Sequence, residues 1–362
     1  MDYPEKNAPR QTESDPAGLG IDTTKDMDSL EEMLRATITR HDQKATHLKL
    51  LSDIFKAGMK LAKESPGTLN LKIASTVLKE LRFSFKMFYP HRYAPKITMF
   101  GSARVPPNTP LYEFTKKFAA EAVKRKFMVI TGGCPGIMAA GNEGAANAGF
   151  GLNIRLPVEQ EPNKFIDTEK MLIHYKYFFT RKLFLVKEAC AFAFFPGGFG
   201  TFDEAFEVLT LLQTGKSTLF PVVLVEPKGF GFWTSFCKFI EEVPMKMGFL
   251  SPSDHFLYRV FHSYTEALDH IELFYRNYHS MRYVKENLVL RLKKKLPDSV
   301  VAEINEKFGF LASRGAIAQG GPLPEEANEP EIKDLPRLTF AFDRHDYGNL
   351  RRLIDFINES TV

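Results

Sequence analysis

The stretch AFAFFPGGFGTFDE at residues 191–204 decides the fold, because an apolar run passes through a glycine-rich turn into a helical pattern. Residues 191–195 contain no polar member, which is typical of a strand buried on both faces of a parallel sheet. The turn at 195–201 follows, and a helical stretch begins at about residue 202. A strand, a tight turn and a helix in this order form the repeating unit of an α/β protein.

The same unit recurs on both sides of this stretch. Each apolar run is followed by a glycine-containing turn and then by a helical pattern. We expect strands at residues 97–100, 128–131, 152–156, 191–195 and 221–225, with helices at about 111–126, 136–148, 179–189 and 202–214. A sixth strand at 256–261 and a helix at 264–278 should close the unit. The alternation predicts an α/β fold, a Rossmann-like doubly wound parallel sheet.

The chain divides by composition into four parts. Residues 1–26 are polar and contain several prolines, which predicts a disordered tail. Residues 27–92 show helical periodicity and predict a helical N-terminal extension that packs on the main domain or forms an oligomer contact. Residues 93–278 hold the Rossmann-like domain. For the C-terminal extension, residues 279–362, we predict a basic helix, a helix at about 298–308, a linker at 319–336, a strand at 338–342 and a helix at 347–358.

Composition limits the class of protein. The chain has 362 residues, a net charge of +4 and three cysteines. The cysteines lack CxxC spacing and are odd in number, so neither a zinc ribbon nor a disulfide framework is supported. The longest apolar run, residues 189–195, is far shorter than the ~20 residues of a membrane helix. Residues 1–20 lack the apolar segment of a signal peptide. We therefore expect a soluble protein of the cytoplasm.

A basic run lies near the C-terminal third and comprises Arg291, Lys293, Lys294 and Lys295. Such a run is usually the solvated face of a helix, and a regulatory phosphate site is the alternative. Binding of single-stranded DNA would need a basic groove with interleaved aromatic residues. The run lies on a predicted helix away from the glycine turns. We therefore do not expect a nucleic acid as the partner.

Three glycine turns follow predicted strands, at the edge where an open parallel sheet binds ligands. They read FGSAR at 100–104, TGGCPG at 131–136 and FPGGFGT at 195–201. Glycine lets backbone amides approach an anion, and the dipole of the following helix favours a phosphate there. Any one loop could be ordinary turn chemistry, but three along one edge are a stronger sign of a site. Their spacing matches neither GxGxxG nor GxxxxGK[ST], which favours a monophosphate over a dinucleotide or triphosphate.

At this point the sequence resembles a known family. PGGFGTFDE at residues 196–204 matches the PGGxGTxxE motif of the Lonely Guy family, which consists of nucleoside 5′-monophosphate phosphoribohydrolases often mislabelled as lysine decarboxylases. Arg181 and Lys182 precede the motif at the family's usual separation. The turns at 101–102, 131–133 and 135–138 also stand where related members have theirs. The resemblance runs from about residue 95 to residue 278, and the later segment is similar to the long form of the family.

The resemblance implies an activity and a set of residues. The activity is hydrolysis of the N-glycosidic bond of AMP or a cytokinin riboside monophosphate, giving free base and ribose 5-phosphate, with no cofactor and no metal. The family also forms at least dimers with sites near subunit contacts, so a homodimer or higher homo-oligomer is expected. The catalytic residues carried over are Arg181 and Glu204. The substrate-binding residues carried over are Gly101, Ser102, Gly132, Gly133, Met138, Lys182, Gly197, Gly198, Phe199, Gly200, Thr201 and Thr210.

Both catalytic candidates have a second interpretation. Glu204, which we expect in the first turn of a helix, lies three residues after Thr201, and this spacing also matches a capping box. In the catalytic role its carboxylate would stabilise positive charge on the ribose or take a proton from water. A cation such as Arg181 in the first turn of a helix opposes the helix dipole, and an anionic substrate would supply the reason for it. The alternative is a surface arginine.

Two positions depart from the family pattern, and two other functions stay open. Ala139 stands where many bacterial relatives carry a glutamate, and Cys134 replaces the third glycine of a common turn. Both departures bear on base recognition or loop shape. A non-catalytic nucleotide-binding or molybdenum-cofactor-binding protein of the same fold would keep the glycine loops without needing Arg181 or Glu204. Lysine decarboxylation would require pyridoxal phosphate and a Schiff-base lysine, and no lysine lies in a convincing context.

Overall fold

The computed structural model describes residues 45–64, 66–156, 161–326 and 329–361, together with residues 29, 32 and 36. The chain divides after Ser75 into two compact units, and each is described by itself. The predicted disordered tail, residues 1–26, lies outside the described residues. The described part of the first unit consists of helix α2 (Ala45–Glu64) and the beginning of helix α3 (Gly67–Phe88). Helix α3 continues into the second unit from Thr76 onward.

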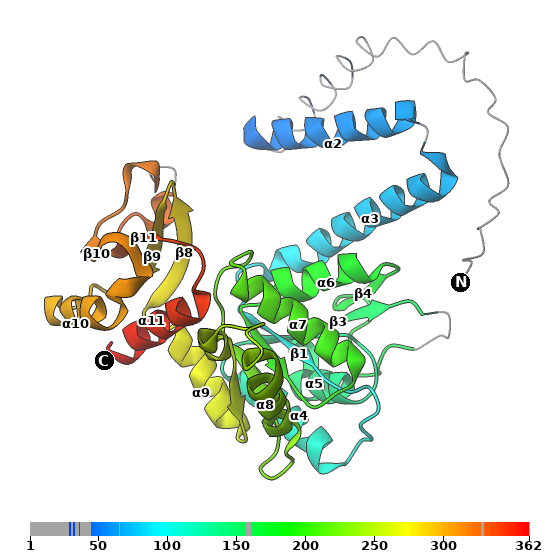
Figure 1. The fold of residues 1–362 in the computed structure, drawn as a ribbon. Helices are drawn as coiled ribbons and strands as arrows, with labels where there is room; N and C mark the ends of the chain where they lie inside the picture. The colour runs from blue at the N-terminus through cyan, green and yellow to red at the C-terminus, as the bar shows by residue number, and fades with distance from the viewer. Residues whose placement is uncertain are drawn as a thin grey trace, which may run out of the picture. The chain divides into compact units, whose positions relative to one another are not determined.

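A seven-stranded parallel sheet forms the centre of the second unit (Figure 1), in the order β4-β3-β2-β1-β5-β6-β7. The predicted Rossmann-like α/β fold is therefore confirmed. The strands are β1 (Lys96–Phe100), β2 (Met128–Thr131), β3 (Gly149–Ile154), β4 (Leu172–Tyr175), β5 (Ala191–Phe194), β6 (Val222–Val225) and β7 (Arg259–Phe261). The helices around them are α4 (Pro110–Lys124), α5 (Ile137–Ala145), α6 (Phe178–Lys187), α7 (Phe199–Gln213), α8 (Phe232–Ile240) and α9 (Tyr264–Phe274).

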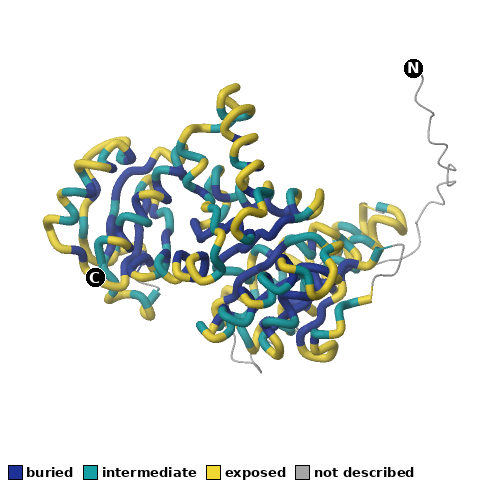
Figure 2. The backbone as a smooth tube through the Cα atoms, turned by 90° about the horizontal axis from the view of Figure 1, so that it is seen from below, coloured by how far each residue is buried: buried dark blue, intermediate teal, exposed yellow. Residues whose placement is uncertain are grey.

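Both faces of the sheet are covered, as its continuous apolar strands require. In β5, Phe192 and Phe194 pack in one core cluster with residues of α6, α7 and α8. Ala191 and Ala193 pack in the other cluster with residues of α4, α5 and α9. This alternation follows from the period of two in a strand. Figure 2 shows the buried backbone gathered in the strands and the exposed backbone in the surrounding helices and loops.

The edge strand β4 was not predicted. Its sequence, Leu172–Tyr175, is short and includes the exposed His174, so it lacks the continuous apolar pattern of the central strands. It pairs only with β3 within the described sheet. The predicted sixth strand, 256–261, is also shorter than expected, because a 3-10 helix, η4 (Pro252–Leu257), occupies its first part.

The C-terminal extension contains a second, antiparallel sheet, in the order β10-β11-β9-β8. Its elements are β8 (Tyr278–Val284), β9 (Asn287–Leu292), α10 (Asp298–Phe308), β10 (Ala312–Gly320), β11 (Arg337–Phe342) and α11 (Tyr347–Glu359). The predicted helix at 298–308, strand at 338–342 and helix at 347–358 are confirmed. The remaining short helices are η1 (Tyr89–His91), η2 (Ala146–Ala148), η3 (Glu241–Met245), η5 (Gly309–Leu311), η6 (Pro324–Glu326) and η7 (Pro330–Ile332).

The predicted basic helix after Tyr278 is wrong, because the segment forms the hairpin β8–β9. Arg291 is not on a solvated helix face but is buried in β9, paired with Glu326 and Glu329. The charge pattern misled the prediction because a buried arginine and an exposed one look the same in sequence. The predicted linker at 319–336 is also partly occupied by the end of β10 and by η6 and η7.

Helix α11 attaches the C-terminal extension to the Rossmann-like domain. A Cβ on Gly215, which follows α7, would lie 1.9 Å from the ring of Tyr347. Arg351 Nη2 lies 2.9 Å from His270 Nε2 in α9, and burial followed by the Arg351 charge lowers the pKa of this histidine to about 3. Close packing and a buried hydrogen bond therefore join the two parts. Among the described residues, no helix combines the length and apolar character needed to cross a bilayer.

Candidate active site

The three predicted glycine loops meet at the carboxyl edge of the sheet, because β2, β1 and β5 are neighbours. The amide of Ser102, after β1, donates a hydrogen bond to Pro196 O at 3.1 Å, after β5. The carbonyl of Ser102 accepts from the amide of Ile137 at 3.0 Å, at the start of α5. Gly136, with φ of +69°, lies so close to Ser102 that a Cβ on Gly136 would be 2.3 Å from Ser102 O. Ser102 is thus the centre of a tightly packed junction of all three loops.

The start of helix α7 offers backbone donors to an anion. The helix begins at Phe199, and its N-cap residue, Gly198, supplies no side-chain hydrogen bond. The amides of Phe199 and Gly200 occupy the first two helical positions, which have no partner within a helix. Cβ atoms on Gly198 and Gly200 would meet nothing within 4 Å, and the Phe199 side chain is 95% exposed. The N-terminus of a 15-residue helix is therefore open to a phosphate-sized ligand.

Arg181 lies in the first turn of α6 and reaches the second glycine loop. Its Nε donates a hydrogen bond to Leu152 O in β3 at 2.7 Å. A Cβ on Gly132 would lie 2.3 Å from Arg181 Nη2 and 2.7 Å from Met138 Sδ, so a side chain at 132 would displace the guanidinium. Burial lowers the pKa of Arg181, while the charge of Glu204 raises it. Arg181 is therefore a partly buried, charged group held at the loop rather than a free surface arginine.

Glu204 is a buried carboxylate that does not use all of its capacity to accept hydrogen bonds. The residue is only 5% exposed, and its Oε2 has no hydrogen-bond partner within the described part of the chain. The nearest cation, Lys182 Nζ, is 3.8 Å from Oε2. Burial raises the pKa of Glu204 from its ordinary value of 4.5 to about 7, although Lys182 and then Arg181 oppose the rise. Such a group changes its protonation state near neutral pH, which suits a general acid or base.

The capping-box interpretation of Glu204 is wrong. Helix α7 begins at Phe199, earlier than the predicted residue 202, so Glu204 lies in its second turn and not in its first. The position that would close a capping box belongs to Thr201, and the Thr201 amide donates to Gly198 O at 3.0 Å. The glycine pair before the helix allowed it to extend toward the strand, which shifted Glu204 away from the cap. The carboxylate is therefore not used for capping.

Lys182 is bound by acidic side chains of α7. Its Nζ lies 2.9 Å from Asp203 Oδ2 and 2.6 Å from Glu207 Oε2, in addition to its longer contact with Glu204. Burial lowers the pKa of Lys182, but the hydrogen bonds to Glu207 and Asp203 outweigh it and the pKa is raised. Lys182 is thus a permanent cation that joins α6 to α7 beside Glu204.

The structure does not bring Thr210 to the glycine loops. This residue is exposed on α7 and lines a separate, mostly apolar cavity with Phe206, Gln213 and Tyr258. Thr210 lies six positions after Glu204, and at 3.6 residues per turn the two side chains leave the helix in different directions. Of the predicted binding residues, Thr210 is the one that the fold separates from the rest.

Asparagines that the sequence reasoning missed fix the second glycine loop. Thr131 Oγ1 donates to Asn142 Oδ1 at 2.6 Å, and the Gly133 amide donates to Thr131 Oγ1 at 3.0 Å. Asn163 Nδ2 lies 3.1 Å from Gly133 O and 3.0 Å from Asn142 Oδ1. These residues come from different segments, so no local spacing could have signalled them. They hold the loop against which Arg181 rests.

A cavity of about 510 Å³ adjoins this junction on the side of α5. Ala139, the departure from the family pattern, is one of its lining residues, so the missing glutamate leaves open space here. Glu143, one turn farther along α5, accepts a hydrogen bond from the Tyr112 hydroxyl at 2.8 Å and pairs with Lys116 at 2.7 Å. The other lining residues include Ala103, Arg104, Pro135, Gly136, Asn163, Lys164 and Phe165.

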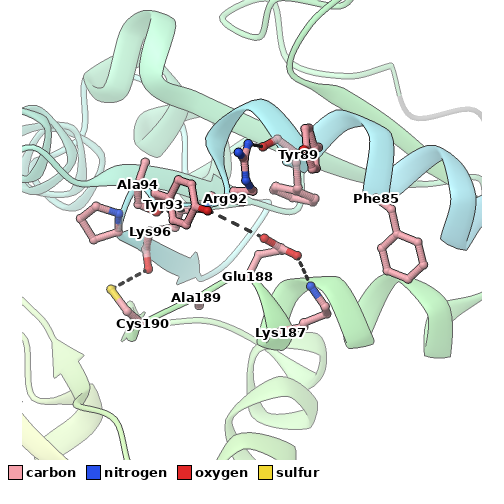
Figure 3. Close-up of a pocket in the computed structure, with 12 residues that line it drawn as sticks. Phe85, Tyr89, Arg92, Tyr93, Ala94, Lys96, Lys187, Glu188, Ala189 and Cys190 are labelled. Carbon is pink, nitrogen blue, oxygen red and sulfur yellow. Dashed lines mark hydrogen bonds and ion pairs between the residues drawn. The ribbon is translucent and has the colours of Figure 1, made fainter. Parts of the chain in front are cut away.

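A second cavity, of about 530 Å³, lies at the amino ends of β1 and β5 (Figure 3) and contains none of the glycine loops. Its buried cation, Lys96, already donates to His91 O at 2.7 Å and Ala94 O at 3.0 Å. Lys187 is paired with Glu188 at 2.5 Å. Because these charges are occupied and Arg181 and Glu204 lie elsewhere, the candidate active site is the loop junction and not this cavity.

Comparison with known proteins places the site in a family. Residues 135–271 match the sequence profile of a family described as possible lysine decarboxylase. Both Arg181 and Glu204 lie within the matched segment, and the resemblance predicted from PGGFGTFDE is confirmed there. No sequence among the curated proteins matches this chain.

Solved structures match about half of this chain at low identity. The molybdenum cofactor binding protein from Rippkaea orientalis is 17% identical, with a TM-score of 0.36, covering 49% of this chain and 96% of that one. The molybdenum cofactor carrier protein from Chlamydomonas reinhardtii is 20% identical, with a TM-score of 0.34 and coverage of 49% and 96%. DNA processing protein A from Helicobacter pylori is 13% identical, with a TM-score of 0.35 and coverage of 49% and 80%.

Proposed function

We propose that this chain, whose residues 135–271 belong to the Lonely Guy-type family, hydrolyses the N-glycosidic bond of a nucleoside 5′-monophosphate. The products are the free base and ribose 5-phosphate, and the substrate class is AMP or a cytokinin riboside monophosphate. The observation that carries the proposal is the state of Glu204. It is a buried carboxylate with a pKa of about 7 and an oxygen that has no partner among the described residues, and the charge of Arg181 acts on it.

Hydrolysis of the N-glycosidic bond requires a carboxylate near the anomeric carbon. As the bond between C1′ and the base nitrogen breaks, its electron pair goes to the base and positive charge develops on the ribose. The unpartnered oxygen of Glu204 would stabilise that charge and take one proton from the attacking water. The hydroxyl of the water then bonds to C1′, and a proton reaches the departing base. An oxygen already satisfied by a cap or an ion pair could not act in this way.

The phosphate would be held by the loop that precedes α7. The free amides of Phe199 and Gly200 and the hydroxyl of Thr201 supply neutral donors, and the helix dipole favours the negative charge. Arg181, with its terminal nitrogen against Gly132, supplies a cation on the side of the second loop. Because a monophosphate presents one anionic group, this set of donors fits it better than an extended polyphosphate.

The direct test is an assay of the purified protein with AMP and other nucleoside monophosphates. The proposal expects adenine and ribose 5-phosphate in equal amounts from AMP, detected by chromatography. Adenosine and phosphate as products would indicate phosphatase chemistry and contradict the proposal. Tight binding of AMP without any product would instead support the non-catalytic nucleotide-binding function.

We also propose that the protein is a homo-oligomer. Phe178, Phe179 and Leu183 on α6 and Phe206 on α7 are large apolar side chains exposed to solvent. Lys182 joins the two helices through Asp203 and Glu207, and exposed apolar groups on adjoining helices favour association. Light scattering should give a mass of at least two chains, and a monomer at micromolar concentration would contradict this proposal.

A further inference from the structure

The helix that carries Arg181 begins without a cap of its own. Helix α6 starts at Phe178, and the side chain of its N-cap residue, Tyr177, accepts no hydrogen bond from the helix. Arg181 occupies the first turn, where a positive charge opposes the helix dipole. The start of α6 therefore needs a negatively charged partner from elsewhere in the chain.

Glu80 of helix α3 is that partner. Its side chain is 9% exposed, and its Oε1 accepts a hydrogen bond from the Lys176 amide at 2.6 Å. Its Oε2 accepts a hydrogen bond from the hydroxyl of Thr180. The carboxylate thus contacts the chain on both sides of the helix start. Its charge is placed where a helix N-terminus favours an anion, next to the residue that precedes Arg181.

Further contacts hold α3 along α6. One turn after Glu80, Ser84 Oγ lies 2.6 Å from the hydroxyl of Tyr175, at the end of β4. Farther along, the rings of Phe85 and Phe88 lie 5.5 Å and 6.1 Å from the ring of Phe184 in α6. Helix α3 therefore contacts the start and the middle of α6, and Glu80 is its charged contact nearest to Arg181.

Arg181 has few other constraints on its position. Its side chain is tied by one hydrogen bond, from Nε to Leu152 O, and its terminal nitrogen rests against a glycine that has no side chain to hold it. Its backbone is held by the first bond of the helix, from its amide to Tyr177 O at 3.3 Å, which is long. A shift of the helix start would therefore move the guanidinium away from the loop.

We propose that Glu80 is a positioning residue for Arg181: from α3, its carboxylate binds the Lys176 amide just before α6 and the Thr180 hydroxyl in the first turn of α6. The proposal rests on the function proposed above, in which Arg181 acts on the substrate. It gives the N-terminal extension a role in the site, because α3 supplies a carboxylate that holds the start of α6. Glu80 itself touches no substrate in this scheme.

Three variants test the proposal. In Glu80→Ala both contacts at the start of α6 are lost, and kcat for AMP should fall about 10- to 100-fold, the cost of a misplaced catalytic group. In Glu80→Gln the amide can still accept from the Lys176 amide and pair with the Thr180 hydroxyl, so at least half of this loss, on a logarithmic scale, should be recovered. Ser84→Ala is the matched control, because it removes a buried hydrogen bond from the same helix one turn away. It should keep kcat within about 3-fold of wild type.

A double variant separates positioning from general destabilisation. If Glu80 acts through Arg181, Glu80→Ala should lower kcat no more than about 2-fold when Arg181 is already alanine. The proposal would be overturned if the loss of kcat in the double variant equalled the product of the losses in the two single variants. Equal losses of kcat in Glu80→Ala and Ser84→Ala would overturn it as well. Circular dichroism and thermal unfolding verify that each variant is folded at the assay temperature.

An activity-independent measurement keeps the two proposals apart. Amide hydrogen exchange of a peptide spanning residues 176–187 should accelerate at least about 10-fold in Glu80→Ala and less than about 3-fold in Ser84→Ala, because the two Glu80 contacts hold the first turn of α6 closed. If the wild type does not hydrolyse nucleotides but this difference appears, the proposed function fails and the positioning of the α6 start by Glu80 stands. Unchanged exchange in Glu80→Ala overturns that positioning.

Discussion

Two clusters of buried charge in this protein differ in how they are satisfied. In the C-terminal sheet, Glu326 is fully buried, and both of its oxygens are occupied. Oε1 accepts from Arg291 Nε and Nη2 at 2.8 and 2.6 Å, and Oε2 accepts from the Leu323 amide at 3.0 Å and Arg337 Nε at 3.2 Å. At the loop junction, Glu204 is almost as buried, but its Oε2 has no hydrogen-bond partner among the described residues.

The pKa values follow this difference. Burial alone would raise the pKa of Glu326, but the Leu323 amide and then the two guanidinium groups outweigh it, and the pKa is lowered. Burial raises the pKa of Glu204 to about 7, because its cations are too distant to compensate. The comparison teaches that burial of a carboxylate does not indicate function by itself. A buried carboxylate with an oxygen left without a hydrogen-bond partner is the one that indicates chemistry.

The largest expected effect belongs to the cluster around Glu326, whose carboxylate oxygens are both hydrogen-bonded. Glu326→Ala leaves Arg291 and Arg337 buried without their partner, which should lower the free energy of unfolding by about 3–5 kcal/mol. Turnover of the folded fraction should stay unchanged, since the cluster is in the C-terminal sheet. Urea unfolding monitored by circular dichroism measures the loss. A change below about 1 kcal/mol would remove the contrast between the two clusters.

The next effect should fall on activity. Arg181→Ala and Glu204→Gln are each expected to reduce kcat/KM for AMP at least ~100-fold, the usual cost of one general acid–base or electrostatic group. Thermal unfolding should show that Glu204→Gln is at least as stable as wild type, because an unpartnered buried carboxylate costs free energy. Near-normal turnover in either variant would contradict the assignment. The steady-state assay of base release gives both constants.

A smaller effect should appear as a pH dependence. If Glu204 acts as a carboxylate with a pKa of about 7, kcat/KM should rise about tenfold per pH unit below pH 7 and level off above it. The sign follows from the raised pKa, since protonation removes the active form. The pH profile of the residual activity of Glu204→Gln is the control. It should lack the rise of kcat/KM below pH 7 but keep any titration of the substrate phosphate. An identical limb in the variant would assign the titration to another group.

The smallest effect is expected at Cys134. Its thiol is buried, and burial raises its pKa although the charge of Arg181 lowers it, so it is a poor nucleophile. Cys134→Ala should therefore keep kcat/KM within about 3-fold of wild type, and iodoacetamide should not inactivate the native protein. Rapid inactivation, protected by AMP, would show that the thiol takes part in the chemistry.

The sequence predicted the Rossmann-like domain well because its central strands are continuous apolar runs. Residues 191–195 and 128–131 could be located within a residue, since they are buried on both faces and punctuated by glycine. Strands β4 and β8 were missed because partly exposed strands mix polar and apolar residues. Strand β9 is almost wholly buried, but it ends at the basic run that begins with Arg291. The basic run from Arg291 was misread for a related reason, because its partners come from a distant segment.

For the site, the local motif predicted which residues gather but not how they are paired. The loop after β5, the loop after β1 and Arg181 meet as expected, whereas Thr210 lies in a different cavity. The distance along α7 could have excluded Thr210, because helical geometry turns it away from Glu204. No comparable local rule could have indicated Asn163 or Glu80.

The sequence by itself determined the strand, turn and helix at residues 191–204, because apolar runs, glycines and helical periodicity act over a few neighbouring residues. It also predicted the resemblance to the family whose profile matches residues 135–271. Only the tertiary structure decided that Glu204 Oε2 has no hydrogen-bond partner among the described residues and that Glu80 binds the Lys176 amide and the Thr180 hydroxyl at the start of the Arg181 helix. Burial and pairing of charges depend on groups brought together from distant parts of the chain, and no local pattern specifies those partners.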